Sequence, residues 1–485
     1  MRPGTIWGLT SSLVAAIGCA HYPHTAPTPA TAPLGVLDRE GYRFENFPAT
    51  GRNTDSVFVI LTFSGGGTRA AAFAYGALQE LARTSIDSGS RARSLLDEVD
   101  VISTISGGSF AGAFYKLYGI DSLASFERLF LNWNAEGALK SALLSGNIFR
   151  LASRDFSRGD LAAEAWDKRL FHGATFGAML AQKKRPYLIV NATDMAVGAP
   201  FSFTQEQFDP MCDDLSKFPI ARAVAASSAF PGLLTPITIE NHAGSCAFKP
   251  PRWAVSDSTD AHTNADAFRA ARDYFSYTDS SRRPYIHLMD GGPSDNLGIR
   301  PILRGLTSSA RDFSLLRLQA NNRLSRIIVI VINARTSDVS TIDKSPNPPG
   351  LLGVLKAAAG VPFDNYSNES LTRLESLSQQ RRADRTATEC YFRALARLNP
   401  DSARRIAPTL VPIDIVQVTF DDVKDPVERA FFLGVPTTFS LPPATVTRLR
   451  DVAGQLLRES KQFQQVLRSL RHLDKPESLR CLDLS

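Results

Sequence analysis

The residues at the end of one apolar run are of the types found around an activated nucleophile. The run begins at Val99 and ends at Ile105, Ser106 follows, and Gly107 and Gly108 open a stretch of small residues. A serine at a sharp strand-to-helix turn presents its hydroxyl outward, and its neighbours must be small because the backbone bends there. The N-terminus of the following helix also stabilises negative charge. We therefore predict that Ser106 is a nucleophile, with an ordinary tight connection as the alternative.

A second chemical pattern is the glycine run Gly65-Gly66-Gly67, which separates an apolar run at 56–63 from a helical pattern at 70–83. Three successive glycines let main-chain N–H groups turn toward one point, which makes an anion site. The run lacks the Lys-Ser/Thr of a P-loop and the G-x-G-x-x-G pattern. We predict an oxyanion hole for a tetrahedral intermediate, with a phosphate loop or a flexible turn as the alternatives.

The third pattern is Asp290, which ends another apolar run and precedes two glycines. A carboxylate at such a place can approach another loop closely, although Asp-Gly-Gly is also a common turn. A Ser-His-Asp triad would need a histidine. His287 should point to the opposite face of the same strand, and His472 lies in a polar C-terminal stretch. We therefore predict a dyad in which Asp290 takes the proton of Ser106, and burial must raise the aspartate pKa from about 3.9.

The serine, the glycine run and the aspartate can act together only if the strands that carry them end at the same edge of one sheet. Continuous β-branched and aromatic runs at 56–63, 186–194 and 326–333 are typical of strands buried on both faces of a parallel sheet. Helical patterns separate these runs, which predicts an α/β fold with a mostly parallel sheet covered on both faces. Sites in such sheets form beyond the carboxyl ends of the strands, where the three patterns fall.

Other polar residues are expected to support these elements. Asn191 and Asp194 could assist the site, but capping a turn at a strand end is the commoner use of such residues. Asp295 and Asn296 are expected to cap the following helix. A single amphipathic helix is predicted over 445–473.

Composition bounds the class of protein. The chain has 485 residues, of which 44% are hydrophobic and 21% charged, and these are globular values. The formal net charge of +6 is diffuse, without the Lys/Arg block that marks a nucleic-acid-binding arm. We therefore expect no nucleic-acid partner and a mild attraction to anionic surfaces such as membranes.

The N-terminus indicates export. A mostly apolar stretch at 6–17 is too short to span a bilayer, which takes about 20 residues, and it fits a signal peptide over residues 1–18. Gly18-Cys19 resembles a bacterial lipobox, which predicts lipidation of Cys19 and a membrane-anchored lipoprotein of the bacterial envelope. Plain signal-peptide cleavage and a retained segment are the alternatives. Residues 19–50, rich in Pro, Ala and Thr at their start, are expected to form a tether.

Four further cysteines could form disulfides in an exported chain. Three connectivities are possible, and isolated buried thiols are an alternative. We favour the pairs Cys212–Cys246 and Cys390–Cys481.

The three chemical patterns together resemble the patatin-like phospholipase family. Looser matches at 191–194 and 226–231 extend the resemblance over about residues 56 to 300. Two departures, Thr104 and Ala70, stand where the family has glycine, and neither removes a reacting group. The residues that carry the resemblance are Gly65, Gly66, Gly67, Thr68 and Arg69 in the glycine loop, Ser106, Gly107 and Gly108 in the serine motif, and Asp290, Gly291 and Gly292.

The resemblance implies a three-layer α/β/α sandwich with a catalytic core at 51–335 and a helical and strand extension at 336–485 packed on it. It implies hydrolysis of acyl esters in a lipid or phospholipid substrate at a membrane surface by a Ser–Asp dyad, without a metal ion or cofactor. The oxyanion would be held by the amides of Gly65 to Gly67 and of Gly107. Arg69 would either orient the loop or be a solvated residue at the start of a helix. Oligomeric state, head group and acyl preference stay open.

Two other functions are compatible with these residues. A lipid-anchored binding or assembly protein could keep the hydrolase scaffold without turnover. An esterase or acyltransferase on non-phospholipid substrates would use the same residues.

Overall fold

The computed structural model describes residues 40–87, 92–144, 147–153, 156–259, 262, 264–307, 324–336, 346, 350–398 and 410–471. Cys19, His472 and Cys481 lie outside the described residues. Within this part of the chain, no helix is long and apolar enough to cross a bilayer.

One sheet organises the described residues, with strand order β5-β6-β3-β2-β1-β7-β8 and β4 paired to β3. The pairs from β3 through β2, β1 and β7 to β8 are parallel, whereas β4, β5 and β6 pair antiparallel. The central strands are buried along their whole length, as their continuous apolar runs predict. The strands are β1 (Val57–Phe63), β2 (Val99–Ile105), β3 (Tyr187–Asp194), β4 (Ala199–Ser202), β5 (Ile237–Glu240), β6 (Tyr285–Met289), β7 (Arg326–Asn333) and β8 (Ile413–Thr419).

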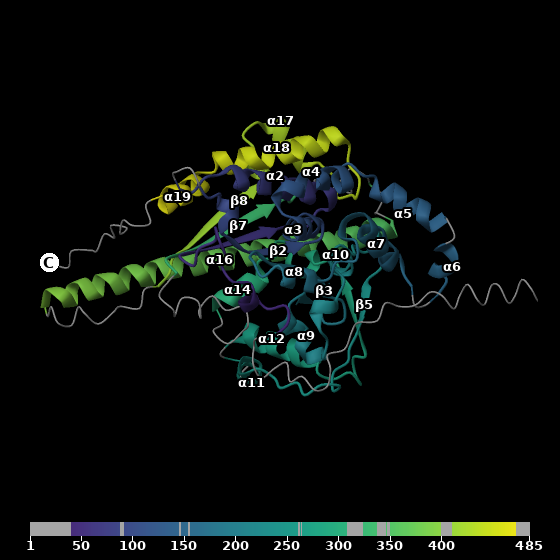
Figure 1. Cartoon of the computed structure of the whole chain (residues 1–485), viewed down its shortest axis with the longest axis horizontal. Coiled ribbons are helices and arrows are strands. Elements are labelled where there is room, and N and C mark those ends of the chain that lie inside the picture. Colours follow the sequence, from purple (N-terminus) through teal and green to yellow (C-terminus); the bar gives the residue numbers. More distant parts are fainter. Residues whose placement is uncertain are drawn as a thin grey trace, which may run out of the picture.

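Helices cover both faces of this sheet, so the expected three-layer α/β/α fold is confirmed (Figure 1). Figure 1 shows α2 and α18 packed together above the sheet, with α16 running below it and past its edge. The helices are α2 (Gly67–Arg83), α3 (Gly107–Tyr118), α4 (Leu123–Phe126), α5 (Ala135–Leu144), α6 (Asn147–Leu151), α7 (Arg158–Trp166), α8 (Phe176–Ala181), α9 (Gln205–Phe208), α10 (Ile220–Ser227), α11 (Arg252–Asp257), α12 (Ala265–Ser276), α13 (Gly292–Asp295), α14 (Arg300–Thr307), α16 (Leu351–Leu398), α17 (Pro426–Leu433), α18 (Pro443–Glu459) and α19 (Lys461–Leu470).

The expected tether ends earlier than residue 50. Tyr42, Phe44 and Phe47 are buried in the main core, and the rings of Tyr42 and Tyr187 are stacked with centroids 4.9 Å apart. The Tyr42 hydroxyl donates to the carbonyl of Leu188 in β3 at 3.0 Å and accepts its N–H at 3.2 Å. Residues 42–47 therefore belong to the folded body, because three aromatic side chains in a polar stretch still bury enough surface to order it.

The C-terminal region contributes to both the sheet and one of the helical layers. It supplies β8, which pairs in register with β7, and α18, which packs along α2. The single helix predicted over 445–473 is wrong, since α18 ends at Glu459 and α19 begins at Lys461. Ser460 separates them in an extended conformation, and its hydroxyl accepts the N–H of Phe463 at 3.2 Å as a helix cap.

Candidate active site

Ser106 lies at the turn between β2 and α3. Its φ of 47° and ψ of −120° are unusual for a residue with a side chain. The strain persists because the surrounding structure holds the turn: the Ser106 N–H donates to the hydroxyl of Ser227 at 2.8 Å. The helix that starts at the next residue directs its N-terminal partial positive charge at this position.

Glycines allow the neighbouring segments to approach this turn. A Cβ on Gly107 would overlap the carbonyl oxygen of Gly67, and one on Gly108 would lie 2.7 Å from the Cβ of Phe63. The N-termini of α2 and α3 therefore meet beside Ser106 in a way that larger residues would prevent.

The glycine loop presents fewer free amides than the sequence predicts. Gly66 and Gly67 have φ values of 135° and 59°, which favour glycine. The Gly65 N–H donates to the carbonyl of Asn296 at 3.1 Å, and the Thr68 N–H donates to the carbonyl of Thr438 at 2.8 Å. Among the described residues no acceptor faces the amides of Gly66 and Gly67. The expected role of Gly65 as an oxyanion donor is corrected, because its N–H is already used within the backbone.

Arg69 is a buried residue that orients the loop, not a solvated one. Its Nε donates to the carbonyl of Ala334 at 2.9 Å, its Nη1 to that of Val435 at 2.5 Å, and its Nη2 to the hydroxyl of Thr437 at 3.1 Å. We call residues 435–441 the C-terminal strap. The guanidinium, with donors in a fixed fork, joins the glycine loop to this strap.

The strap is itself anchored. The ring of Phe439 packs against Phe110 and Trp166, with centroids 6.1 and 5.5 Å apart. The Phe439 N–H donates to the carboxylate of Glu136 at 3.0 Å. The strap therefore connects the glycine loop to the aromatic core beside α3.

Asp290 reaches the site from an antiparallel strand. β6 pairs with β3 in the register Thr193 to Met289, so it delivers Asp290 back toward the end of β2. Asp290 therefore follows the end of a strand as expected, and this strand is one of the antiparallel members of the mostly parallel sheet. A Cβ on Gly291 would meet the Asn191 carbonyl oxygen at 2.7 Å, which explains the glycine after the aspartate.

The structure brings Ser106 and Asp290 together. The Ser106 side chain lies close enough to the Asp290 carboxylate to lower its pKa. Both side chains are nearly enclosed, with exposed fractions of 5% and 3%. Burial raises the pKa of Asp290 to about 6, and the hydrogen bond from the Gly292 N–H, at 2.9 Å, and the Ser106 side chain oppose part of this rise. The upward shift that the sequence required of a base is present.

Thr104, where the family pattern has glycine, fits because other residues make room. The Cγ2 atom of Thr104 occupies the space beside Gly112, where a Cβ would lie 2.6 Å from it. Its hydroxyl donates to the carbonyl of Ile189 at 3.3 Å and accepts a hydrogen bond from Ser109 at 3.0 Å. The substitution therefore adds hydrogen bonds below the nucleophile without entering the site.

Other polar residues have mainly structural partners. Asp194 accepts the N–H of Ala196 at 3.0 Å and the Tyr277 hydroxyl at 2.8 Å, and it pairs with Arg283. Asp295 is the last residue of α13, and it accepts the N–H of Arg300, the first residue of α14, at 2.7 Å.

Asn191 and Asn296 lie closer to the chemistry than the sequence indicated. The Asn191 carbonyl accepts the Ser227 hydroxyl at 2.6 Å. A Cβ on Gly65 would lie 2.4 Å from the side-chain oxygen of Asn296 and 3.3 Å from the Cβ of Ser106. Sequence reasoning missed Ser227, Asn296 and the strap, because only the tertiary fold brings them to Ser106.

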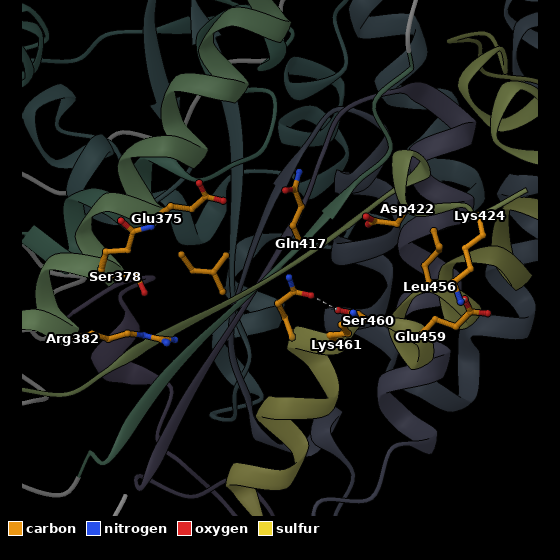
Figure 2. Close-up of a pocket in the computed structure, with 13 residues that line it drawn as sticks. Glu375, Ser378, Arg382, Gln417, Asp422, Lys424, Leu456, Glu459, Ser460 and Lys461 are labelled. Carbon is orange, nitrogen blue, oxygen red and sulfur yellow. Dashed lines mark hydrogen bonds and ion pairs between the residues drawn. The ribbon is translucent and has the colours of Figure 1, made fainter. Parts of the chain in front are cut away.

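One hollow among the described residues lies away from the dyad. It has a volume of about 510 Å³ and opens between α16, β8 and the junction of α18 and α19 (Figure 2). Figure 2 shows Glu375, Arg382, Lys424 and Glu459 around it. The lining is mostly polar and includes no residue of the dyad or of the glycine loop. We therefore assign it no part in the chemistry.

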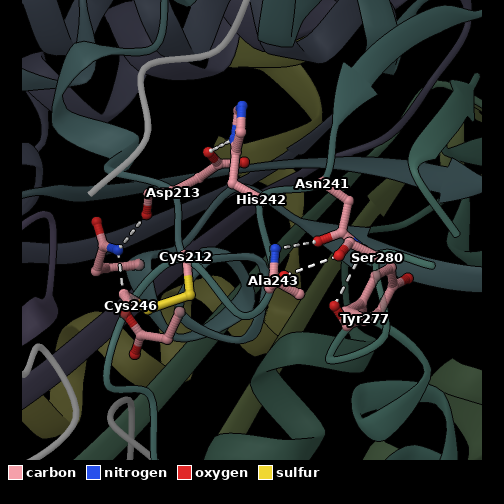
Figure 3. Close-up of a disulfide and its surroundings, with 10 residues drawn as sticks. Cys212, Asp213, Asn241, His242, Ala243, Cys246, Tyr277 and Ser280 are labelled. Atoms are coloured by element: carbon pink, nitrogen blue, oxygen red, sulfur yellow. Dashed lines mark hydrogen bonds and ion pairs between the residues drawn. A yellow bond between two sulfur atoms is a disulfide. The ribbon is translucent and has the colours of Figure 1, made fainter. Parts of the chain in front are cut away.

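One of the favoured disulfide pairs is formed. Cys212 and Cys246 are joined, with a Cα–Cα distance of 5.6 Å, next to Asp213 and His242 (Figure 3). Cys390 lies in α16 and Cys481 lies outside the described residues, so that pairing stays a prediction. No group of three or more potential metal ligands occurs within the described ranges.

Comparisons with known proteins identify one family. A family model described as patatin-like phospholipase matches residues 61–303. A search of curated proteins finds no match. Among solved structures, human GIVD cytosolic phospholipase A2 is 13% identical with a TM-score of 0.41, over 86% of this chain and 62% of that one. VipD from Legionella pneumophila is 12% identical with a TM-score of 0.32, over 86% and 67% of the two chains.

Proposed function

Because the chain belongs to the patatin-like phospholipase family, whose members are lipid acyl hydrolases, we propose that it hydrolyses ester bonds of membrane lipids with Ser106 as nucleophile and Asp290 as base. The observation that carries the proposal is that Ser106, at a strained turn, lies beside the buried carboxylate of Asp290, whose pKa burial raises to about 6. A base of that pKa is ionised at neutral pH and still accepts a proton more readily than an ordinary aspartate.

The reaction proceeds in two acyl transfers. Asp290 takes the hydroxyl proton while the Ser106 oxygen attacks the ester carbonyl, which forms a tetrahedral oxyanion. When the C–O bond to the alcohol breaks, protonated Asp290 gives its proton to the leaving oxygen. Water then attacks the acyl-serine ester with Asp290 again as base, and the proton returns to Ser106 as the fatty acid leaves.

The oxyanion is stabilised by main-chain groups. The amides of Gly66 and Gly67 have no acceptor in the described structure, and Gly107 is the first residue of α3. The first amides of a helix lack intrahelical partners, and helix N-termini carry partial positive charge. Donors fixed before the reaction stabilise the developing charge without reorganisation.

The test combines activity with covalent labelling. Purified wild-type protein should release fatty acid from phospholipid vesicles and react with a fluorophosphonate probe. Ser106→Ala should lose both and keep the circular dichroism spectrum and melting temperature. Ser228→Ala is the matched control, since Ser228 is a buried serine whose hydroxyl has no hydrogen-bond partner among the described residues. Labelling of Ser106→Ala at the wild-type rate, or a wild type that never reacts, would indicate a binding protein on this scaffold.

The substrate class needs a separate comparison. Activity on soluble short-chain esters without activity on any phospholipid vesicle would favour an esterase. Transfer of the acyl group to an added alcohol in preference to water would favour an acyltransferase. Our proposal expects hydrolysis of vesicle phospholipid in preference to both.

The membrane association that we propose rests on Cys19 and its lipobox-like context. Expression of the full chain in a bacterial host should give a protein in the membrane fraction with a diacylglyceryl group on Cys19, detectable by mass spectrometry. Cys19→Ser should move it to the soluble fraction and leave its activity on soluble esters unchanged. Equal membrane recovery of both proteins would contradict lipid anchoring.

A further inference from the structure

The end of α10 holds both partners of the dyad. The Ser227 hydroxyl accepts the Ser106 N–H at 2.8 Å, and the Ser227 carbonyl accepts the Gly291 N–H at 3.2 Å. Two residues later, the Ala229 carbonyl accepts the Asp290 N–H at 3.1 Å. Three hydrogen bonds from one short segment therefore fix the backbones of nucleophile and base relative to each other.

The Ser227 hydroxyl has a defined direction. It is fully buried and donates its only proton to the Asn191 carbonyl in β3 at 2.6 Å. Its lone pairs therefore face the Ser106 N–H, and the Ser109 hydroxyl lies 3.0 Å away. This arrangement satisfies an amide that the strained turn would otherwise leave buried and unpaired.

We propose that Ser227 is a positioning residue that sets the spacing between Ser106 and Asp290. The inference rests on the proposed dyad and goes beyond it, because Ser227 contacts neither reacting group through its side chain. Its side chain joins the nucleophile's backbone to β3, and its main chain joins the loop after Asp290 to α10. Small errors in the placement of reacting groups cost large factors in rate.

The simpler interpretation is that Ser227 is only a core residue needed for folding. The neighbouring residue separates the two interpretations. Ser228 is equally buried, and within the described chain its hydroxyl has no hydrogen-bond partner. A serine-to-alanine change removes one hydroxyl at either position. Only the change at Ser227 removes the acceptor of the Ser106 N–H.

The experiment uses the purified full chain and a soluble uncharged ester. We expect Ser227→Ala to lower kcat and the fluorophosphonate labelling rate by about 10- to 100-fold, which corresponds to about 1.4 to 2.7 kcal/mol of activation free energy, and to change KM less than twofold. Ser227→Cys, close in volume but a weak hydrogen-bond acceptor, should lower kcat in the same direction. Ser228→Ala should keep kcat within twofold.

The outcomes separate this inference from the proposed function. If either folded Ser227 variant keeps kcat and labelling within twofold of wild type, Ser227 does not position the dyad, whatever Ser106→Ala does. If Ser227→Ala does not fold, Ser227→Cys decides. If Ser106→Ala is active while the Ser227 variants are not, the dyad fails and the Ser227 effect belongs to another nucleophile. A Ser228→Ala loss equal to that of Ser227→Ala would assign both to packing.

Discussion

The proposed mechanism needs Asp290 as a base in a place that disfavours its charge. Burial raises its pKa to about 6, while the Gly292 amide and the Ser106 hydroxyl lower it. The ionised form is the active one, so kcat/KM should fall about tenfold per pH unit below pH 6 and level off above it. The profile should be measured with an uncharged soluble ester. A flat profile between pH 5 and 8, with the protein folded throughout, would contradict the assignment.

The same shift predicts an effect on stability. The pKa of Asp290 rises from 3.8 to about 6 in the folded state, so the native protein holds this proton more tightly than the unfolded chain. The favourable contribution is complete below about pH 4 and is lost as pH rises through about 6. Asp290→Asn should therefore be inactive yet more stable than wild type at pH 8, by up to about 3 kcal/mol at 1.36 kcal/mol per pKa unit.

Urea unfolding at two pH values checks this second prediction. The difference in the free energy of unfolding between Asp290→Asn and wild type should be clear at pH 8 and should shrink toward zero near pH 4. A variant less stable than wild type at pH 8 would show that the carboxylate is stabilised by its neighbours more than burial penalises it.

The sequence predicts the role of a residue where that role depends on its neighbours along the chain. Ser106, Gly66 and Gly67 could be predicted because a sharp turn and a helix start require small residues within a few positions. Gly65 was assigned a role that its own hydrogen bond to Asn296 excludes. Ser227 lies in the looser match at 226–231, but its role could not be predicted, because its partner lies 121 positions away and a serine at the end of an alanine-rich helix has no distinguishing spacing.

At the level of elements, strand positions could be predicted and directions could not. The apolar runs located β1, β2, β3 and β7 within a residue or two. Nothing in the run before Asp290 distinguishes a parallel from an antiparallel strand, since direction depends on which neighbour β6 pairs with. The strap was missed for the same reason, because its role comes from contacts with a helix that begins more than 300 positions earlier.

The contact between the strap and α2 predicts a role for Arg69 in activity. Arg69→Lys keeps the charge but cannot reach Ala334, Val435 and Thr437 together. We expect a loss of about tenfold or more in kcat, since the glycine loop that holds the oxyanion loosens, and faster amide exchange at Thr68. Arg83→Lys, an exposed position on the same helix, is the control. Unchanged exchange and kcat in Arg69→Lys would show that the strap does not support the loop.

At the scale of the whole molecule, the disulfide closes a loop that contains the segment holding the dyad. Cys212 and Cys246 are 34 positions apart, and Ser227 and Ala229 lie between them. Replacing both cysteines by serine should lower the free energy of unfolding by about 3 to 4 kcal/mol through the freedom of the unfolded loop. Urea unfolding of this double variant measures the loss, and an unchanged midpoint would contradict it. The other cysteines are not changed, so any loss of stability is due to this disulfide.

Residues 42–47 are part of the folded body, and their contribution to stability is testable by truncation. A chain that starts at residue 40 keeps Tyr42, Phe44 and Phe47 and the buried pair Arg43–Asp209, whose atoms are 2.7 Å apart. It should unfold at the same urea concentration as the full chain. A chain that starts at residue 51 loses all of these contacts and exposes Tyr187 beneath them.

Loss of one buried phenylalanine costs about 3–5 kcal/mol, so removal of three aromatic side chains approaches the total stability of a typical protein, about 5–15 kcal/mol. The chain from residue 51 should therefore be insoluble or largely unfolded. If that chain cannot be purified, Phe47→Ala in the chain from residue 40 offers a smaller change that can be measured. Its free energy of unfolding should fall by about 3 kcal/mol or more. The Tyr42 hydroxyl bonds both main-chain polar groups of Leu188 in β3, so its loss should contribute to the difference. Equal stability of the two truncated chains would show that residues 42–47 add nothing to the folded body and belong to the tether.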